Sequence, residues 1–410
     1  MGSIVVDITP LRESRGFRWL FFSQIGAQLS RFVLVVAVPY QVFLLTGSSL
    51  LVGLVGLVQV LPLVLFSLLG GTIADAFDRR RVLVVVQVLM ACTSLGLAAN
   101  TADDASLWPI FLLITLNASI SGIENPSRSA VIPALVTRRQ LPAALALNQS
   151  LAQTAQVVGP AFAGVLMASF GVAAAYWVSA AAAAAGALSL VSLGAQRPDD
   201  ATGRISMSAT VEGWRYLRRA PLLQQIMLID LNAMVFGMPR ALFPVIGLEV
   251  LAGDATTVGL LHAAPGAGAL LGALTTGWVA AVQAQGRAVV YATMVWGAAI
   301  AAFGLSRSLW VSLVLLAVAG AADVISNVFR NTILQLAVPD RLRGRMNAFN
   351  GALTKSGPPL GDAESGAVAE LTTPTISVVS GGLMSIAGTL FIAWRRRDLW
   401  DQRRDDVIEV

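Results

Sequence analysis

The stretch GGTIADAFDRRRV, from Gly70 to Val82, decides the fold of this chain. It separates two long apolar runs, and it carries five charged residues within the seven positions from Asp75 to Arg81. A short basic segment between two apolar runs is typical of a cytoplasmic loop in a membrane protein. The runs on either side are therefore predicted to be membrane-spanning helices.

The composition of the whole chain also indicates a membrane protein. Of its 410 residues, 56% are hydrophobic and only 12% are charged, whereas soluble domains carry about a quarter charged residues. A helix needs about 20 apolar residues to cross a bilayer, and such runs recur along the sequence. The excess of basic residues then belongs at the cytoplasmic membrane surface, and we expect no nucleic-acid partner.

Apolar runs and their breakers predict twelve transmembrane helices, so the fold class is an all-α polytopic membrane protein. The spans are expected at about residues 17–44, 50–74, 82–101, 108–135, 141–168, 172–193, 221–248, 256–281, 287–304, 308–337, 346–369 and 374–394. The expected domains are a cytoplasmic N-terminal segment (1–16), an N-terminal six-helix bundle (17–193), a cytoplasmic central loop (194–220), a C-terminal six-helix bundle (221–394) and a cytoplasmic tail (395–410). The end of the central loop, residues 211–219, is expected to lie along the headgroups as an amphipathic helix.

Arginines are concentrated in alternate loops, and among the opposite loops only Arg307 interrupts an acidic or neutral composition. The positive-inside rule therefore places both termini in the cytoplasm, and the even number of spans agrees with this. We expect the protein in the inner (plasma) membrane of the cell, in contact with lipid and as a monomer.

The two halves of the sequence repeat each other weakly. Matching residues are Gly47, Gly71 and Arg81 with Gly253, Gly277 and Arg287, at an offset of 206, and Asn125 and Arg128 with Asn327 and Arg330, at an offset of 202. Two six-helix bundles with the same orientation are therefore predicted, pseudo-symmetric about the membrane normal. That architecture places a substrate site near the bilayer midplane, between the repeats.

The opening stretch resembles the signature of the major facilitator superfamily in the loop after the second span. Gly71, Asp75, Arg79 and Arg80 match it, while Ala76 and Asp78 replace a usual basic residue and a usual glycine. The resemblance implies that these four residues latch the cytoplasmic ends of the two halves in the outward-open state. In the second half Ala281 stands where the acid would be, so the latch is expected on one side only.

A second motif, VVGPAFAG from Val157 to Gly164, resembles the Gly-Pro motif of proton-driven antiporters. Pro160 removes a helix hydrogen bond, and Gly159 and Gly164 permit a close helix crossing, so a bend is expected here. The resemblance favours export over uptake. The segments VAVPYQVFLLTGSSLLVGL, LNAMVFGMPRALFP and GAADVISNVFRNTILQLAVPDRLRGR are similar to the branch of drug:proton antiporters that includes the enterobactin exporter.

Five basic and five acidic residues lie inside the predicted spans, more than one helical turn from either end. They are Arg31, Arg128, Arg240, Arg330, Lys355, Glu124, Asp230, Asp323, Asp362 and Glu364. At roughly 3 kcal/mol each, exposing all of them to lipid would cost on the order of 30 kcal/mol. They must therefore line a water-filled cavity or pair with one another.

Proton coupling requires an acid whose proton affinity changes with burial and with neighbouring charge. Asp230 and Asp323 lie nearest the midplane, followed by Glu124, and Asp230 is the first choice because no cation lies one turn away on its own helix. Arg128 and Arg330 are related by the internal repeat and are predicted to form gate pairs. The alternative is that all these charges only hold the bundles together.

Arg31, Arg240 and Lys355, with the neutral groups of Asn232 and Gln153, are candidates for binding an anionic or catechol-bearing cargo. The alternative for the cations is ion pairing with the acids, and for the neutral groups hydrogen bonding between helices.

The leading hypothesis is a secondary active transporter that exports a siderophore or similar amphiphilic molecule by proton antiport and alternating access. The alternatives are a multidrug or antibiotic efflux pump and, in another class, a non-transporting membrane sensor or scaffold. We expect no enzyme, no cofactor and no metal site, because the chain has no nucleotide-binding or hydrolase motif and only one histidine, His262, and one cysteine, Cys92.

Overall fold

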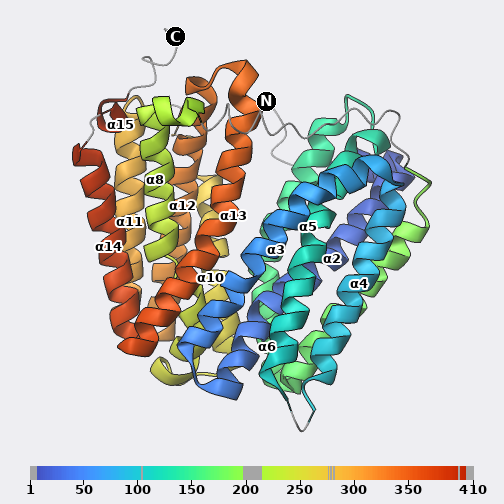
Figure 1. Cartoon of the computed structure of the whole chain (residues 1–410), viewed down its shortest axis with the longest axis horizontal. Helices are drawn as coiled ribbons and strands as arrows, with labels where there is room; N and C mark the ends of the chain where they lie inside the picture. Colours follow the sequence, from blue (N-terminus) through green and yellow to red (C-terminus); the bar gives the residue numbers. More distant parts are fainter. Residues whose placement is uncertain are drawn as a thin grey trace. The chain divides into compact units, whose positions relative to one another are not determined.

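The computed structural model describes residues 7–102, 105–196, 215–275, 277, 279, 282–395 and 398–402, and it contains helices and no β-strand over these residues. The long helices are α2 (Arg15–Thr46), α3 (Ser49–Ala76), α4 (Arg79–Ala99), α5 (Leu107–Leu135), α6 (Leu141–Val191), α8 (Pro221–Phe236), α10 (Ala255–Leu274), α11 (Gln285–Leu305), α12 (Leu309–Ala337), α13 (Asp340–Leu371) and α14 (Pro374–Arg395) (Figure 1). The short elements are α1 (Thr9–Glu13), the 3₁₀ helix η1 (Arg240–Leu242), α9 (Phe243–Val245), the π-helical turn η2 (Ile246–Val250) and α15 (Asp398–Asp401).

Ten of the described helical segments are long and apolar enough to cross a membrane. One of them, α6, has 51 residues and would be about 77 Å long if straight, more than twice the hydrocarbon thickness. It breaks at Gly171, whose φ of 79° is readily adopted by glycine, and so supplies two spans. The more polar α13 has 32 residues and is also long enough to span. These segments make up the twelve predicted spans, and the all-α fold is confirmed.

The helices form two compact units. The first contains Met1–Gly47, Val58–Gly203 and Asp254–Ala263, and the second contains Ser48–Leu57, Arg204–Gly253 and Ala264–Val410. Helix α3 therefore begins in the second unit and continues in the first, while α10 does the reverse. The predicted domain boundaries stay a prediction, because most of the central loop lies outside the described residues. Of the predicted headgroup helix, residues 215–219 are described and are helical.

In the first unit, α6 packs along α2 and α4, and α4 packs along α5 (Figure 1). Phe17 of α2 and Leu190 of α6 are fully buried in its apolar core. Farther along the same helices, the Ser179 hydroxyl lies 2.7 Å from that of Ser30 and 2.9 Å from that of Ser94. Small hydroxyl residues of this kind allow close helix packing and add hydrogen bonds between helices.

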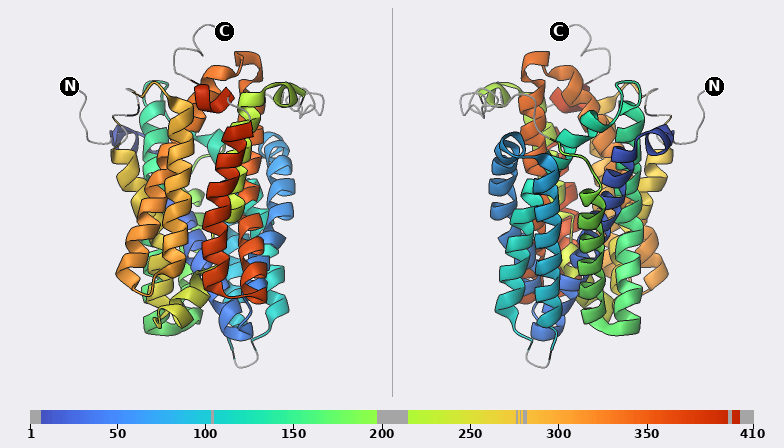
Figure 2. Two further views of the ribbon diagram at one scale, coloured as in Figure 1. Left: turned by 90° about the vertical axis from the view of Figure 1, so that its left-hand side faces the viewer. Right: turned by 90° about the vertical axis from the view of Figure 1, so that its right-hand side faces the viewer.

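In the second unit, α11 packs on α12 and α14, and α8 packs on α13 and α14 (Figure 2). Ile229, Val289 and Phe329 are fully buried in its core. Helix α8 ends at Phe236, and the indole nitrogen of Trp296 donates to the carbonyl of Gly237 at 2.9 Å. This bond satisfies a backbone group that the break in the helix leaves free.

A glycine crossing joins α6 to the start of α10 within the first unit. A Cβ atom on Gly164 would lie 2.7 Å from the carbonyl oxygen of Ala255 and 2.8 Å from Cα of Gly259. A Cβ atom on Gly259 would in turn lie 2.6 Å from the carbonyl oxygen of Pro160. The two backbones therefore touch, and neither glycine tolerates a side chain.

An equivalent crossing joins α13 to the start of α3 within the second unit. A Cβ atom on Gly366 would meet the carbonyl oxygen of Ser49 and would lie 3.2 Å from Cα of Gly53. One on Gly53 would meet the carbonyl oxygen of Asp362. These are the same backbone atoms, at the repeat offsets of 206 and 202, as those of the α6–α10 crossing.

We expect Gly164→Ala to lower the free energy of unfolding of the purified protein by about 1–3 kcal/mol, because the added methyl group overlaps backbone atoms that cannot rotate away. The matched control is Gly351→Ala in α13, where a Cβ atom meets no heavy atom within 4 Å. The melting temperature in detergent should fall for Gly164→Ala and stay the same or rise for Gly351→Ala. Equal melting temperatures would show that the crossing is not tight in solution.

Candidate functional site

A buried ion pair on α5 lies in the first unit, where side chains of α2 and α4 reach it. Nη2 of Arg128 lies 2.6 Å from Oε1 of Glu124, one turn earlier on α5, and the side chains are 7% and 12% exposed. The same nitrogen lies 3.5 Å from the hydroxyl of Ser23 on α2, and Gln87 on α4 donates to Oε1 of Glu124 at 3.1 Å. Three helices thus surround one guanidinium and one carboxylate.

A related site lies in the second unit, where Arg330 of α12 faces two carboxylates. Its Nη2 lies 2.9 Å from Oδ1 of Asp230 on α8 and 3.6 Å from Oδ1 of Asp323 on α12. Its Nη1 donates to the hydroxyl of Ser326 at 3.3 Å, and the hydroxyl of Thr293 on α11 lies 3.3 Å from that of Ser326. Arg330 and Asp230 are both 7% exposed, whereas Asp323 is 40% exposed.

The two sites are built from equivalent positions of the internal repeat. The matching pairs, at offsets of 202 or 206, are Arg128 with Arg330, Glu124 with Ser326, and Gln87 with Thr293. Ser23 and Asp230 each contact the arginine of their own site from α2 and α8. The carboxylate closest to the arginine comes from a different place in each site. In the first it is Glu124, one turn before Arg128 on the same helix, and in the second it is Asp230, on another helix, α8. The arginine position is retained and its neutralising acid is not.

The charges of the two sites differ as a result. In the first site one guanidinium meets one carboxylate, whereas in the second Arg330 meets both Asp230 and Asp323. The second site therefore carries one more acid than it needs for neutrality. Asp323 is also the more accessible of its two acids.

The helical spacing in the sequence suggested the pairing of Glu124 with Arg128 and of Asp323 with Arg330. The shorter contact of Arg330, to Asp230, crosses from α12 to α8 and has no local signal. Asp230 indeed has no cation on its own helix, but a neighbouring helix supplies one.

The basic loop after α3 binds backbone carbonyls of two helices of its own unit, and those of α6 are at the end of that helix. Nη1 of Arg79 donates to the carbonyl of Ala130 in α5 at 3.2 Å. Arg80 donates to the carbonyls of the last two residues of α6, Leu190 at 3.1 Å and Val191 at 2.6 Å. Cations at helix C-termini satisfy free carbonyls and interact favourably with the helix dipole.

Asp78, which replaces a usual glycine of the motif, has a structural role that sequence reasoning missed. Its carboxylate accepts from the backbone N–H of Arg80 at 3.0 Å, which caps α4, and from that of Gln196 at 3.0 Å. Gly71 and Asp75, the other predicted latch residues, lie in α3, but the surroundings of Gly71 and the side chain of Asp75 are outside the described part of the structure. The latch therefore stays a prediction.

The Gly-Pro motif lies where α6 is most tightly packed. A Cβ atom on Gly159 would lie 2.6 Å from Cβ of Phe32 on α2, and Gly164 forms the crossing with α10. Pro160 lies inside the helix, and the backbone leaves helical geometry farther along, at Gly171. The motif is therefore foremost a contact surface for two neighbouring helices.

The predicted cargo-binding residues are distributed over both units. Arg31, exposed, and Gln153, half-buried, lie in the first, and Arg31 lies 5.9 Å from the centre of the Phe32 ring. In the second, Lys355 is exposed and Arg240 is half-buried. Asn232 donates to the carbonyl of Ser385 at 2.8 Å, so its amide joins α8 to α14.

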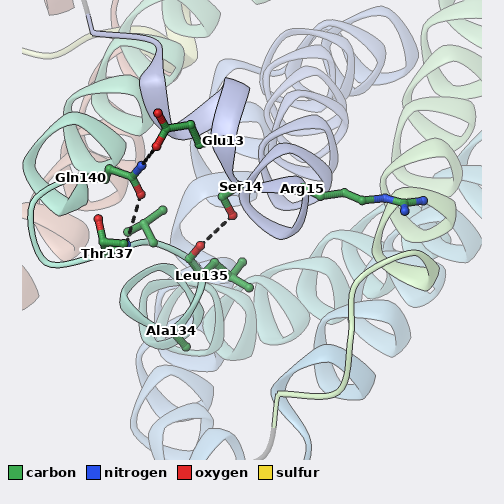
Figure 3. Close-up of a pocket in the computed structure, with 8 residues that line it drawn as sticks. Glu13, Ser14, Arg15, Ala134, Leu135, Thr137 and Gln140 are labelled. Carbon is green, nitrogen blue, oxygen red and sulfur yellow. Dashed lines mark hydrogen bonds between the residues drawn. The ribbon is translucent and has the colours of Figure 1, made fainter.

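A pocket of about 570 Å³ lies where α1 and α2 meet α5 and α6 (Figure 3). Its polar groups bind one another: Ser14 donates to the carbonyl of Leu135 at 2.7 Å, and Gln140 donates to Glu13 and accepts from the N–H of Thr137. These hydrogen bonds connect the ends of neighbouring helices, so the groups that make them are not available to bind a cargo.

Comparison with known proteins supports a transporter. A family model described as transmembrane secretion effector matches residues 6–406. The enterobactin exporter EntS of Citrobacter koseri is 29% identical over 392 residues, which cover 95% of this chain and 94% of that protein. The enterobactin exporter EntS of Escherichia coli O1:K1 is 28% identical with the same coverage.

Solved transporter structures share the fold. A mutant of the nucleoside transporter NupG superposes with a TM-score of 0.76 at 12% identity, covering 94% of this chain and 100% of that one. A bacterial homologue of the human lysosomal transporter Spinster gives a TM-score of 0.72 at 15% identity, covering 94% and 95%.

Moving the carboxylate between equivalent positions tests the relation of the two arginine sites. We expect Glu124→Gln to destabilise the protein by about 3–5 kcal/mol, because it leaves the Arg128 charge buried without an acid. Adding Ser23→Asp places a carboxylate where the second site has Asp230, and it should restore most of the lost stability. Ser23→Asp alone should destabilise, because it adds a second buried acid.

Thermal unfolding in detergent of the wild type, both single variants and the double variant gives the coupling energy between the two positions. A double variant as unstable as the sum of the two single variants would show that the sites are not interchangeable.

Proposed function

Because the chain belongs to the transmembrane secretion effector family and has the fold of a major facilitator transporter, we propose that it exports a catechol siderophore, or an amphiphilic molecule of similar chemistry, in exchange for protons. The cargo is suggested by relatives named enterobactin exporter that match 95% of the chain. Arg31 and Arg240 add cationic groups that complement an anionic, catechol-bearing molecule.

The observation that carries the proton step is the position of Arg330 between Asp230 and Asp323. A proton that binds to one carboxylate leaves Arg330 paired with the other, so Arg330 stays neutralised while the net charge of the site rises by one, from negative to zero. A site with one acid per arginine, such as that of Glu124, loses its neutrality on protonation. The second site is therefore better suited to carry the coupling proton.

Transport proceeds by alternating access in this proposal. The glycine crossings of α3 with α13 and of α6 with α10 separate on one side of the membrane, while the loop with Asp75 and Arg79 closes the other side. Arg128 and Arg330 act as gates in the two halves, each held by its acid until the halves move.

We also infer that the protein is a monomer of the plasma membrane with both termini in the cytoplasm. This orientation rests on the arginine-rich loops that include Arg79, Arg80 and Arg81.

The proton step is tested in liposomes that contain the purified protein and a pH-sensitive dye. A proton gradient is imposed, and iron-free enterobactin is added, followed by unrelated antibiotics. We expect enterobactin-dependent proton movement in the wild type and at least a tenfold slower movement in Asp230→Asn, because the remaining acid is then needed to neutralise Arg330. The control is Asp401→Asn, in an exposed residue of α15, which should retain wild-type rates.

Proton movement that survives in both Asp230→Asn and Asp323→Asn would exclude the second site as the carrier. Movement elicited by antibiotics and not by enterobactin would replace the siderophore with a drug-like cargo. The absence of movement with every compound would contradict proton-coupled export and favour a sensor or scaffold.

The orientation predicts opposite results for two reporters fused to the C-terminus. A green fluorescent protein fusion should be fluorescent and an alkaline phosphatase fusion inactive, because only the former matures in the cytoplasm. Active phosphatase at Val410 would place the C-terminus outside.

A further inference from the structure

The α3–α13 crossing of the second unit carries a carboxylate where its counterpart has a proline. The carbonyl oxygen of Pro160 meets Gly259 in the first unit, and that of Asp362 meets Gly53 in the second. The Gly-Pro motif is therefore matched by Gly361 and Asp362, a relation visible in the backbone contacts. A charged group stands at a helix crossing where the repeat has an apolar one.

The carboxylate of Asp362 lies where three elements meet. Its Oδ1 accepts from the backbone N–H of Ala241 at 3.0 Å, at the start of η1, where the break after α8 leaves N–H groups free. Its Oδ2 lies 3.3 Å from the position that a Cβ atom on Gly56 would take, so it faces the backbone of α3. Asp362 is half-buried as a whole.

Among the described residues, the charged groups that we find near Asp362 lie on η1 and on α13. Arg240 of η1 interacts with it electrostatically. The described start of α3 presents Gly53 and Gly56 to it and no ionisable side chain. On α13 itself, Glu364 lies two residues later and is half-buried, and Lys355 lies two turns earlier and is exposed.

The hydrogen bond to Ala241 does not by itself require a charge, because the amide oxygen of asparagine accepts equally well. A carboxylate in a spanning helix costs about 3 kcal/mol on insertion scales. Closing α3 onto Oδ2 replaces water with glycine backbone, and this costs more for a charged carboxylate than for a neutral one. Closure of the crossing is thus linked to proton binding at Asp362.

We propose that Asp362 is a proton-responsive positioning residue, which favours an open α3–α13 crossing when charged and a closed one when protonated. The inference rests on the proposed alternating access, and it adds a gate whose opening depends on pH and which is separate from the Arg330 site. Protons that enter from the side of the membrane on which α3 begins then bind to Asp362, and the crossing closes.

A buried reporter on α3 tests this without any cargo. Val52 is 2% exposed and precedes Gly53, which lies against α13, so Val52→Cys should react faster with a membrane-impermeant maleimide when α3 leaves α13. The native Cys92 is first replaced by serine, and rates are normalised at each pH to those of Ser308→Cys, an exposed position at the α11–α12 turn. We expect the normalised rate to fall about tenfold between pH 8 and pH 5. This is the change produced when Asp362 binds a proton about tenfold more tightly in the closed crossing than in the open one.

Asp362→Asn keeps the bond to Ala241 and should give a low rate that is independent of pH. Asp362→Glu should retain the pH dependence, and so should Asp230→Asn. If Asp362→Asn does not fold, Asp362→Ser, which also keeps an oxygen acceptor, serves in its place. Wild-type pH dependence in either neutral variant, or a wild-type rate independent of pH, overturns the proposal.

The same variants separate this proposal from the proposed function. If enterobactin and antibiotics elicit no proton movement in the wild type, export by proton antiport fails while the labelling result still decides the role of Asp362. If the wild type exchanges protons but its labelling does not depend on pH, only the gate proposal fails.

Discussion

A guanidinium buried between membrane-spanning helices, away from any water-filled cavity, has to be neutralised by a carboxylate close by, because the hydrocarbon offers neither water nor counterions. Each unit of this protein is organised around one such group, Arg128 in the first and Arg330 in the second. The surrounding polar groups come from equivalent helices in the two units: α2, α4 and α5 in the first, and α8, α11 and α12 in the second. Their packing is therefore constrained by electrostatics as well as by shape.

Duplication preserves geometry better than chemistry in this chain. The backbone atoms that meet at Gly164 and at Gly366 are equivalent, since any side chain there would overlap a neighbouring backbone. The positions around them have diverged, so that Pro160 and Asp362 occupy corresponding places with unrelated properties. Steric contacts allow only glycine, whereas a polar position accepts any side chain that its new neighbours can satisfy. The charge differences between the units, such as the one at Asp362, are found at positions of this second kind.

The basic loop after α3 shows how one motif combines two tasks. Arg79 binds a carbonyl of α5, Arg80 caps the end of α6, and Asp78 caps α4 and binds the backbone beyond α6. These bonds lie within one unit and keep its helix ends together. A loop that moves as a rigid part of its unit can act as a latch toward another, which is consistent with the resemblance on which the latch prediction rests.

The sequence by itself determined the class of fold, the number of spans and the local ion pairs, because apolar length, arginine-rich loops and helical spacing are properties of neighbouring residues. It predicted the pair of Glu124 and Arg128 from their separation by one turn. Only the tertiary structure decided that Arg330 binds Asp230 on another helix, that α3 and α10 each belong to both units, and that Asp362 lies against α3 and η1. Contacts between helices depend on how those helices are rotated and crossed, and this follows from the packing of all of them together.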